Sequence, residues 1–238
     1  MPLCECHTKH GLNFHWSFGN SKLKKNLIIA FNIPALKDKY GRVTCPNAQE
    51  CAVECYALGN RYVIPNVLQA AQHNVDFLFE DKINKFRLFE KYLQEDIALL
   101  QEIGYTTIRI HTSGDFFSFH YYLVWLRAAK KFPQMKFYAY TKMVKWINNT
   151  RWFIPENMKI TCSFGGKQDN SINKAFSHAI VFSSLDDLNR MDYIDTSVKD
   201  TPARDGEIKI GLLRHGNRVS KKKRENWKST EKILQEIE

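Results

Sequence analysis

Three cysteines, Cys45, Cys51 and Cys55, follow one another with the spacing C-x5-C-x3-C, just after an apolar segment that is typical of a β-strand. Thiolates bind iron–sulfur clusters and zinc ions. Three thiolates leave one position open, either on one iron of a [4Fe-4S] cluster or on a zinc ion that then holds water. Ordinary buried thiols or a disulfide are the alternatives. Because these cysteines are clustered among loop-forming residues, the pattern favours a cluster or metal site.

The other cysteines have different surroundings. Cys162 lies in an apolar run, where we expect a buried structural thiol. Cys4 and Cys6 lie in a polar segment with His7 and His10, but their spacing is not that of a standard zinc finger, and a second metal site there stays open. No signal-peptide pattern follows the first residue, so we expect a cytoplasmic protein, in whose reducing surroundings clustered cysteines more often bind metal than form disulfides.

The composition is that of a globular protein with a strong positive charge. The chain has 238 residues, 44% of them hydrophobic, and a formal net charge of +10. This length fits one domain with an ample core, and no apolar run approaches the length of a membrane span. A basic surface favours anionic partners such as nucleic acid, nucleotides or phosphorylated metabolites, although a solvated basic helix is the alternative. The basic residues cluster near the two ends, at Lys22, Lys24 and Lys25 and at Arg214, Arg218, Lys221, Lys222, Lys223, Arg224 and Lys228.

Hydrophobic periodicity predicts strands that alternate with helices. Strands are expected at residues 14–18, 27–33, 105–111, 136–141, 158–163, 179–183 and 208–213. Helices are expected at 67–79, 83–103, 119–131, 142–148, 171–176, 185–191 and 219–237, with a loop at 195–206. Strands separated by helices pair in parallel through right-handed crossovers. The β units from residue 27 onward are too few for the eightfold barrel, so we expect an α/β fold with an open or partial (βα)6 barrel; a doubly wound sheet is the alternative.

We expect residues 1–238 to form a single domain with three parts. Residues 1–25 would form an N-terminal arm and a β-hairpin, which turns at Gly19-Asn20. Residues 26–215 would form the partial barrel, with the cysteine loop at residues 44–60. Residues 216–238 would form a basic C-terminal helix.

Polar residues follow several predicted strands, and in parallel α/β folds sites form at these carboxyl ends. Strand alternation places Thr107, Arg109 and His111 on one face, which we expect to line a polar cavity. Arg109 could instead form a buried ion pair with Asp115, and His111 could be a core histidine. The candidates for substrate contact or proton transfer are His111, Tyr140 and His215.

The segment Ser113-Gly114-Asp115 also follows a predicted strand. A carboxylate beside a glycine could accept hydrogen bonds from a ligand ammonium group, because glycine allows close approach of the backbone. An N-cap turn for the helix predicted from residue 119 is the alternative. Ser163, at the end of another predicted strand, is a further candidate for cofactor binding; the Gly165-Gly166-Lys167 segment after it lacks the full phosphate-loop pattern.

Several of these motifs occur together, in the same order, in a known family. The motifs are Phe31-Asn32-Ile33-Pro34-Ala35, Cys45-Pro46, Cys51 with Cys55-Tyr56-Ala57, Ser113-Gly114-Asp115-Phe116 and Phe137-Tyr138-Ala139-Tyr140-Thr141. In these residues the chain resembles the phage and plasmid proteins called gene product 88-like, over about residues 21–183. A phage-encoded protein would act in the cytoplasm of its bacterial host. The resemblance does not assign an activity.

More distantly, the layout is similar to the radical SAM superfamily. That resemblance implies a partial (βα)6 barrel in which Cys45, Cys51 and Cys55 hold a [4Fe-4S] cluster. It places Gly114-Asp115 where that superfamily binds the amino group of S-adenosylmethionine, and Tyr56 near the adenine. The spacing departs from the usual C-x3-C-x2-C, and the aromatic residue follows the last cysteine instead of preceding it.

These observations lead to three hypotheses about function. The first is a radical SAM-like iron–sulfur enzyme, which needs an electron donor and acts on an unidentified substrate, for which an anionic or nucleotide-derived molecule is the candidate. The second is a non-catalytic phage protein that is stabilised by a cluster or metal and binds nucleic acid through its basic C-terminal segment. The third is a zinc hydrolase, which the sequence supports least because thiolates reduce the acidity of zinc and no glutamate is placed as a base.

Overall fold

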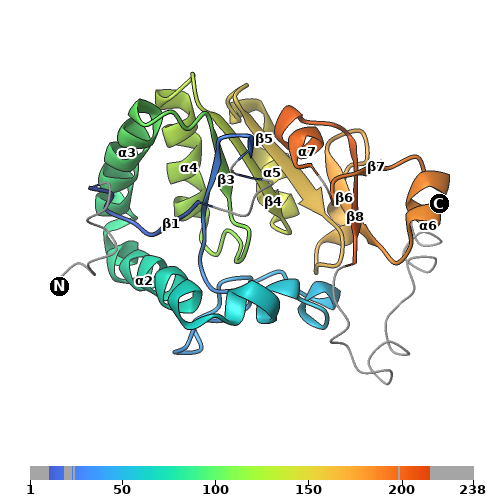
Figure 1. The fold of residues 1–238 in the computed structure, drawn as a ribbon, viewed down its shortest axis with the longest axis horizontal. Coiled ribbons are helices and arrows are strands. Elements are labelled where there is room, and N and C mark those ends of the chain that lie inside the picture. Colours follow the sequence, from blue (N-terminus) through green and yellow to red (C-terminus); the bar gives the residue numbers. More distant parts are fainter. Residues whose placement is uncertain (1–10, 19–22, 24, 198, 215–238) are drawn as a thin grey trace.

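The structure is a computed structural model that describes residues 11–18, 23, 25–197 and 199–214. In this part of the chain, eight strands form one sheet in the order β1-β2-β3-β4-β5-β6-β8-β7 (Figure 1). The strands are β1 (Trp16–Ser17), β2 (Ile28–Phe31), β3 (Thr107–Ile110), β4 (Lys136–Thr141), β5 (Met158–Ser163), β6 (His178–Phe182), β7 (Ile194–Asp195) and β8 (Lys209–Leu213). Only the β1–β2 pair is antiparallel among the described pairs. The fold is therefore a mixed α/β fold with a mostly parallel sheet.

The sheet is open, with β1 and β7 at its edges. From β2 to β6 each strand pairs with the next strand along the chain, and β8 follows β6. A doubly wound sheet would reverse its strand order near the middle, and this sheet does not. Because the strands from β2 to β8 pair in parallel, their carboxyl ends lie at the same edge of the sheet.

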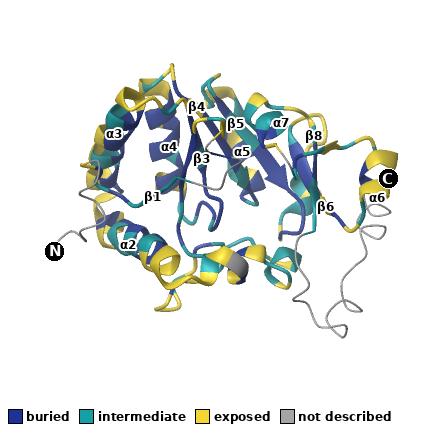
Figure 2. Cartoon of the chain, in the orientation of Figure 1, coloured by how far each residue is buried: buried dark blue, intermediate teal, exposed yellow. Residues whose placement is uncertain are grey.

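Helices connect the strands. They are α2 (Pro65–Asp81), α3 (Arg87–Glu102), α4 (Phe119–Lys131), α5 (Val144–Thr150), α6 (Leu185–Arg190) and α7 (Thr201–Asp205). Helix α3 forms because Phe89, Leu93, Ile97 and Leu100 recur at helical spacing, and all four side chains are fully buried. Figure 2 shows the central strands buried and the outer side of α3 exposed.

The two faces of the sheet have different cores. Alternate residues such as Ile108 and Ile110 of β3 pack in the larger core with Trp125 of α4. On the opposite face, Tyr138 of β4 packs in a smaller cluster with Ala203 of α7. The loop predicted from the sequence at residues 195–206 is wrong in part. The segment contains α7 and one residue of β7, because its apolar and acidic side chains find partners on the sheet.

Other predicted elements differ in their bounds. The helix predicted at 83–103 is interrupted, because Lys85 and Phe86 both adopt left-handed backbone conformations before α3 begins. In place of the helix predicted at 171–176, the structure has a short 3-10 helix at Asp169–Ser171. The predicted N-terminal hairpin is present as the antiparallel β1–β2 pair, but β1 is only two residues long. The arm at residues 1–10 and the basic helix at 216–238 lie outside the described residues.

Among the described residues, no helix combines the length and the apolar composition needed to cross a bilayer.

Candidate functional site

The chain that leaves β2 runs along the carboxyl edge of the sheet as far as α2, and we call residues 44–60 of it the cysteine loop. In Figure 1 the pale blue and cyan segments lie beneath the strand ends. Asn47 donates its side-chain amide to the carbonyl of Lys142, just after β4, at 3.1 Å. Cys51 donates its backbone N–H to the carbonyl of Gly165, just after β5, at 3.0 Å. Glu54 forms an ion pair with Arg214, just after β8, at 2.8 Å. The cysteine loop thus reaches from the first parallel strand to the last.

The thiols of Cys45, Cys51 and Cys55 are all free and partly exposed. Burial raises the pKa of each thiol, and for Cys45, where the charge of Asp115 adds to the effect, the pKa rises to about 12. Cys51 and Cys55 both raise the pKa of Cys45, and Cys51 raises the pKa of Cys55, so the three thiols lie within range of electrostatic interaction.

Backbone N–H groups approach these sulfur atoms. Leu36 donates to Sγ of Cys45 at 3.3 Å. Backbone hydrogen bonds also lower the pKa of Cys51 and Cys55, against the larger effect of burial. Such donors stabilise negative charge on sulfur. Among the described residues, no three His, Cys, Asp or Glu side chains gather closely enough to hold one metal ion.

The turn after β3 packs tightly against the chain that leaves β2. Ser113 donates its hydroxyl to the carbonyl of Ile33 at 2.8 Å, and its own carbonyl accepts from the N–H of Ile33 at 3.3 Å. Gly114 has a φ of +87°, and a Cβ there would collide with the side chain of Ile33. The glycine is therefore needed for the close approach of two strand ends.

Asp115 is buried and holds two strand ends together. Its Oδ1 accepts hydrogen bonds from Oγ1 of Thr141 at 2.6 Å and from the N–H of Phe116 at 2.7 Å. Its Oδ2 accepts from the N–H of Lys142 at 2.9 Å. The partners expected from the sequence are a ligand ammonium, Arg109 or the N-terminus of a helix. In the structure the carboxylate binds the turn after β4 instead, and Ser118 occupies the N-cap of α4.

His111 lies on the face of the sheet that carries the larger core. Its φ is +64°, so the alternation that would place it beside Arg109 ends at this residue. The imidazole is 3% exposed, and its Nε2 lies 2.8 Å from the hydroxyl of Tyr121 in α4. Burial lowers the pKa of His111 to about 3, so the ring is neutral. The prediction that His111 lines the polar interior is wrong, and the core histidine considered as its alternative is what the structure has.

On the opposite face, Arg109 forms an ion pair with Asp200 at 2.6 Å, not with Asp115 as the sequence suggests. Asp200 also accepts a hydrogen bond from the hydroxyl of Tyr138 at 2.8 Å. The guanidinium lies 5.4 Å from the ring centre of Tyr140, and burial raises the pKa of that tyrosine to about 12. This part of the interior is therefore filled by the protein's own ion pair.

The remaining predicted residues lie at or near the same edge. Tyr56 donates its hydroxyl to the carbonyl of Thr112, after β3. Ser163 accepts a hydrogen bond at its Oγ from Nζ of Lys142 at 3.0 Å. His215 lies outside the described residues. The structure thus brings together the cysteines, Tyr56, Ser113, Gly114, Asp115 and Ser163. Tyr140 lies instead beside Arg109 on the face of the smaller core, and His111 lies in the larger core.

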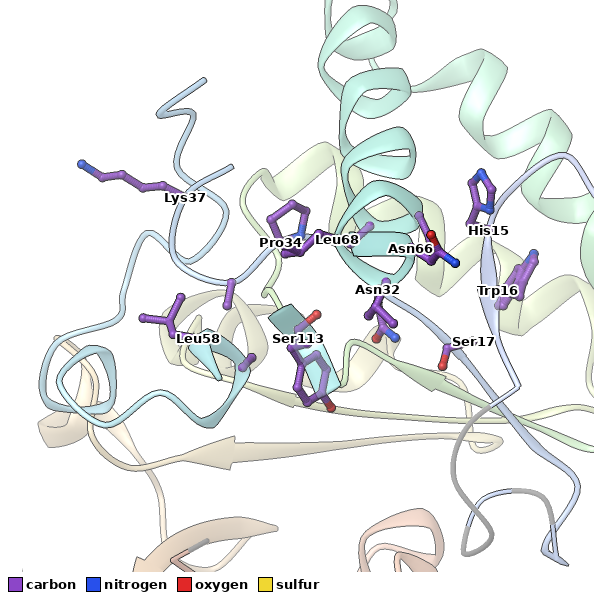
Figure 3. Close-up of a pocket in the computed structure, with 16 residues that line it drawn as sticks. His15, Trp16, Ser17, Asn32, Pro34, Lys37, Leu58, Asn66, Leu68 and Ser113 are labelled. Atoms are coloured by element: carbon purple, nitrogen blue, oxygen red, sulfur yellow. The ribbon is translucent and has the colours of Figure 1, made fainter. Parts of the chain in front are cut away.

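A pocket of about 280 Å³ lies beside the cysteine loop (Figure 3). Its walls come from β1, the segment after β2, the cysteine loop and the first turns of α2. The lining residues include Trp16, Asn32, Pro34, Leu58, Leu68 and Ser113. The Oδ1 of Asn32 accepts hydrogen bonds from the N–H and hydroxyl of Thr112, both at 2.7 Å, which fixes its amide. The side chain of Lys37 points away from the pocket in Figure 3. The pocket offers a small molecule a largely apolar place at this edge.

Sequence reasoning missed four residues that organise the site: Asn47, Glu54, Lys142 and Asp200. Lys142 carries a recognisable signal, because it directly follows the strand predicted at 136–141. The others lie in loops, and their partners are distant in the sequence.

A comparison with protein families gives a match to the family described as Gene product 88, over residues 11–229. This match covers most of the chain. The chain belongs to the Gene product 88 family. The family match confirms the resemblance to gene product 88-like proteins. The resemblance to the radical SAM superfamily has no support from a family match. No curated protein and no solved structure shows a significant match to the chain.

Proposed function

We propose that Cys45, Cys51 and Cys55 hold a [4Fe-4S] cluster whose fourth iron is open to a small molecule. The observation that carries the proposal is that all three thiols are free, partly exposed and approached by backbone hydrogen-bond donors. Hydrogen bonds to sulfur are among the interactions by which proteins tune such clusters. A single zinc ion would need its ligands gathered more closely than the described side chains are, whereas a cubane binds each cysteine through a different iron.

The fold supports an enzyme of radical SAM-like architecture as the finer form of this proposal. From β2 to β6 the parallel strands succeed one another in chain order, as in a partial (βα)6 barrel, and the cysteine loop follows the first of them. When bound, the cluster would supply one-electron reduction to a molecule at its open iron, with S-adenosylmethionine as the candidate and a separate protein or reagent as electron donor. The oxygens of Asp115 accept hydrogen bonds from Thr141, Lys142 and Phe116, so an ammonium that bound there would share the carboxylate with these three donors.

The first experiment is to purify the protein without oxygen and measure iron, acid-labile sulfide, zinc and the absorption spectrum. We expect about four irons and about four sulfides per chain, as one cubane cluster contains. Cys51→Ala should lose most of both. Cys162→Ala is the matched control, because it removes a free thiol that is buried in the larger core, and it should keep the cluster.

About one zinc per chain without sulfide would overturn the cluster proposal. If the cluster is present, the second experiment incubates the reduced protein with S-adenosylmethionine and measures 5′-deoxyadenosine by chromatography. A cluster-loaded protein that neither binds nor cleaves S-adenosylmethionine would refute the radical SAM-like part alone.

A further inference from the structure

Lys142 joins three separate segments at the carboxyl edge of the sheet. Its backbone N–H donates to Oδ2 of Asp115 at 2.9 Å, and its carbonyl accepts from Asn47 of the cysteine loop at 3.1 Å. The residue therefore connects the turn after β3, the end of β4 and the cysteine loop through its backbone alone.

The ammonium group of Lys142 has a fixed position. Its Nζ donates to the carbonyl of Phe164 at 2.7 Å, to Oγ of Ser163 at 3.0 Å and to the carbonyl of Ser163 at 3.2 Å. A Cβ at Gly166 would come within 2.9 Å of Cδ of Lys142, so the glycine makes room for the lysine stem. The next carbonyl along the chain, that of Gly165, accepts the backbone N–H of Cys51 at 3.0 Å. The ammonium of Lys142 and the backbone N–H of Cys51 thus bind two consecutive carbonyls, those of Phe164 and Gly165.

The charges around the thiols are of both signs. The carboxylates of Asp115 and Asp169 raise the pKa of Cys51, after the larger effect of burial. Lys142 acts in the opposite direction on both Cys51 and Cys55. A cluster held by three thiolates would add negative charge at this place, next to two carboxylates. A positive charge that cannot move away then becomes important, because electrostatic interactions strengthen where water is partly excluded.

We propose that Lys142 is a positioning residue that presents a fixed positive charge to the cluster held by the three cysteines and raises its reduction potential. This inference rests on the proposed function. Net charge and exposure are among the factors that set the potential of an iron–sulfur cluster. A nearby cation stabilises the reduced form, which carries one more negative charge than the oxidised form.

The test uses the full chain with its cluster and compares Lys142→Met, Lys142→Gln and Lys142→Arg with the wild type. Lys142→Met keeps the length of the side chain without its charge, and Lys142→Arg keeps the charge. Lys145→Met is the matched control, because Lys145 is exposed on the neighbouring helix α5. Iron and sulfide content, circular dichroism and the midpoint potential from a mediated optical titration are measured for each.

We expect Lys142→Met and Lys142→Gln to shift the midpoint potential to more negative values, while Lys142→Arg and Lys145→Met stay close to the wild type. A neutral variant that is loaded and has the wild-type potential overturns the inference. If neither neutral variant retains the cluster, the Lys142→Arg variant decides. A cluster retained in Lys142→Arg supports the requirement for a positive charge, and a cluster lost in all three Lys142 variants overturns the inference. A wild-type protein without iron and sulfide refutes the proposed function instead.

Discussion

His111 shows how one backbone angle changes the role of a side chain. It follows β3 directly, but its positive φ turns the imidazole into the core, where it meets Tyr121. In this place the ring is held neutral, because burial lowers its pKa to about 3. A neutral imidazole that contacts the core contributes to stability, and that contribution must depend on pH.

We expect His111 to destabilise the fold as the pH falls below about 6.5, the pKa of an exposed histidine. The unfolded chain then binds a proton that the folded chain does not bind until about pH 3, so the free energy of unfolding falls with decreasing pH. Between pH 7.5 and 5.5 this single group should cost about 1.4 kcal/mol.

The measurement is urea unfolding at both pH values for the wild type and for His111→Asn. Asparagine is chosen because it tolerates a positive φ better than most residues. The variant should lose about 1.4 kcal/mol less than the wild type over this interval, since other titrating groups cancel in the comparison. Equal losses in the two proteins would show that His111 is not held neutral by the fold.

At the scale of elements, a buried ion pair with Arg109 of β3 holds the start of α7 against the sheet. Asp200 directly precedes α7, is 4% exposed, and binds both Arg109 and Tyr138. Removing one member of a buried ion pair leaves the other charge without a partner, which costs about 3–5 kcal/mol. Replacing both members avoids that penalty.

We therefore expect Asp200→Ala to reduce the free energy of unfolding by about 3–5 kcal/mol. The double variant Arg109→Met with Asp200→Ala should be more stable than Asp200→Ala alone. Chemical denaturation of the two single variants and the double variant gives the coupling energy. Additive effects would mean that the pair does not hold α7 against the sheet.

The bounds of the helices and strands show which elements the local sequence determines. Helix α4 and strands β4 and β5 begin and end at the predicted residues, because each is a complete periodic segment bounded by turn residues. The predicted helix at 83–103 fails at Lys85–Phe86, where the apolar pattern continues although the backbone does not. Helix α7 was missed because its five residues are too short for a periodic signal, and it packs on strands far away in the sequence.

For the whole molecule, the net charge of +10 is the property that supports the alternative function of nucleic-acid binding. Positive charge favours phosphate-rich partners without specifying a sequence. If the protein uses its charge in this way, binding should weaken steeply with salt, because each phosphate contact releases counterions.

We expect a fluorescein-labelled DNA oligonucleotide to bind at about 50 mM salt and to lose at least about tenfold in affinity at about 200 mM. Fluorescence anisotropy at a series of salt concentrations measures the slope. Cys51→Ala should keep this affinity, because binding through positive charge alone does not need the cluster. The absence of binding at low salt would contradict the nucleic-acid alternative.

The amino-acid sequence by itself determined the alternation of strands and helices, the single edge at which the cysteine loop and the turn at Ser113–Asp115 meet, and the family of the chain. These features are local, because periodicity and spacing record which residues are buried and in which order elements follow. Tertiary structure alone decided the partners: Asp200 for Arg109, Lys142 and Thr141 for Asp115, and Tyr121 for His111. Each of these contacts joins segments that pack together only after the sheet has formed, so the polar groups that need partners in the interior could not be matched from spacing alone.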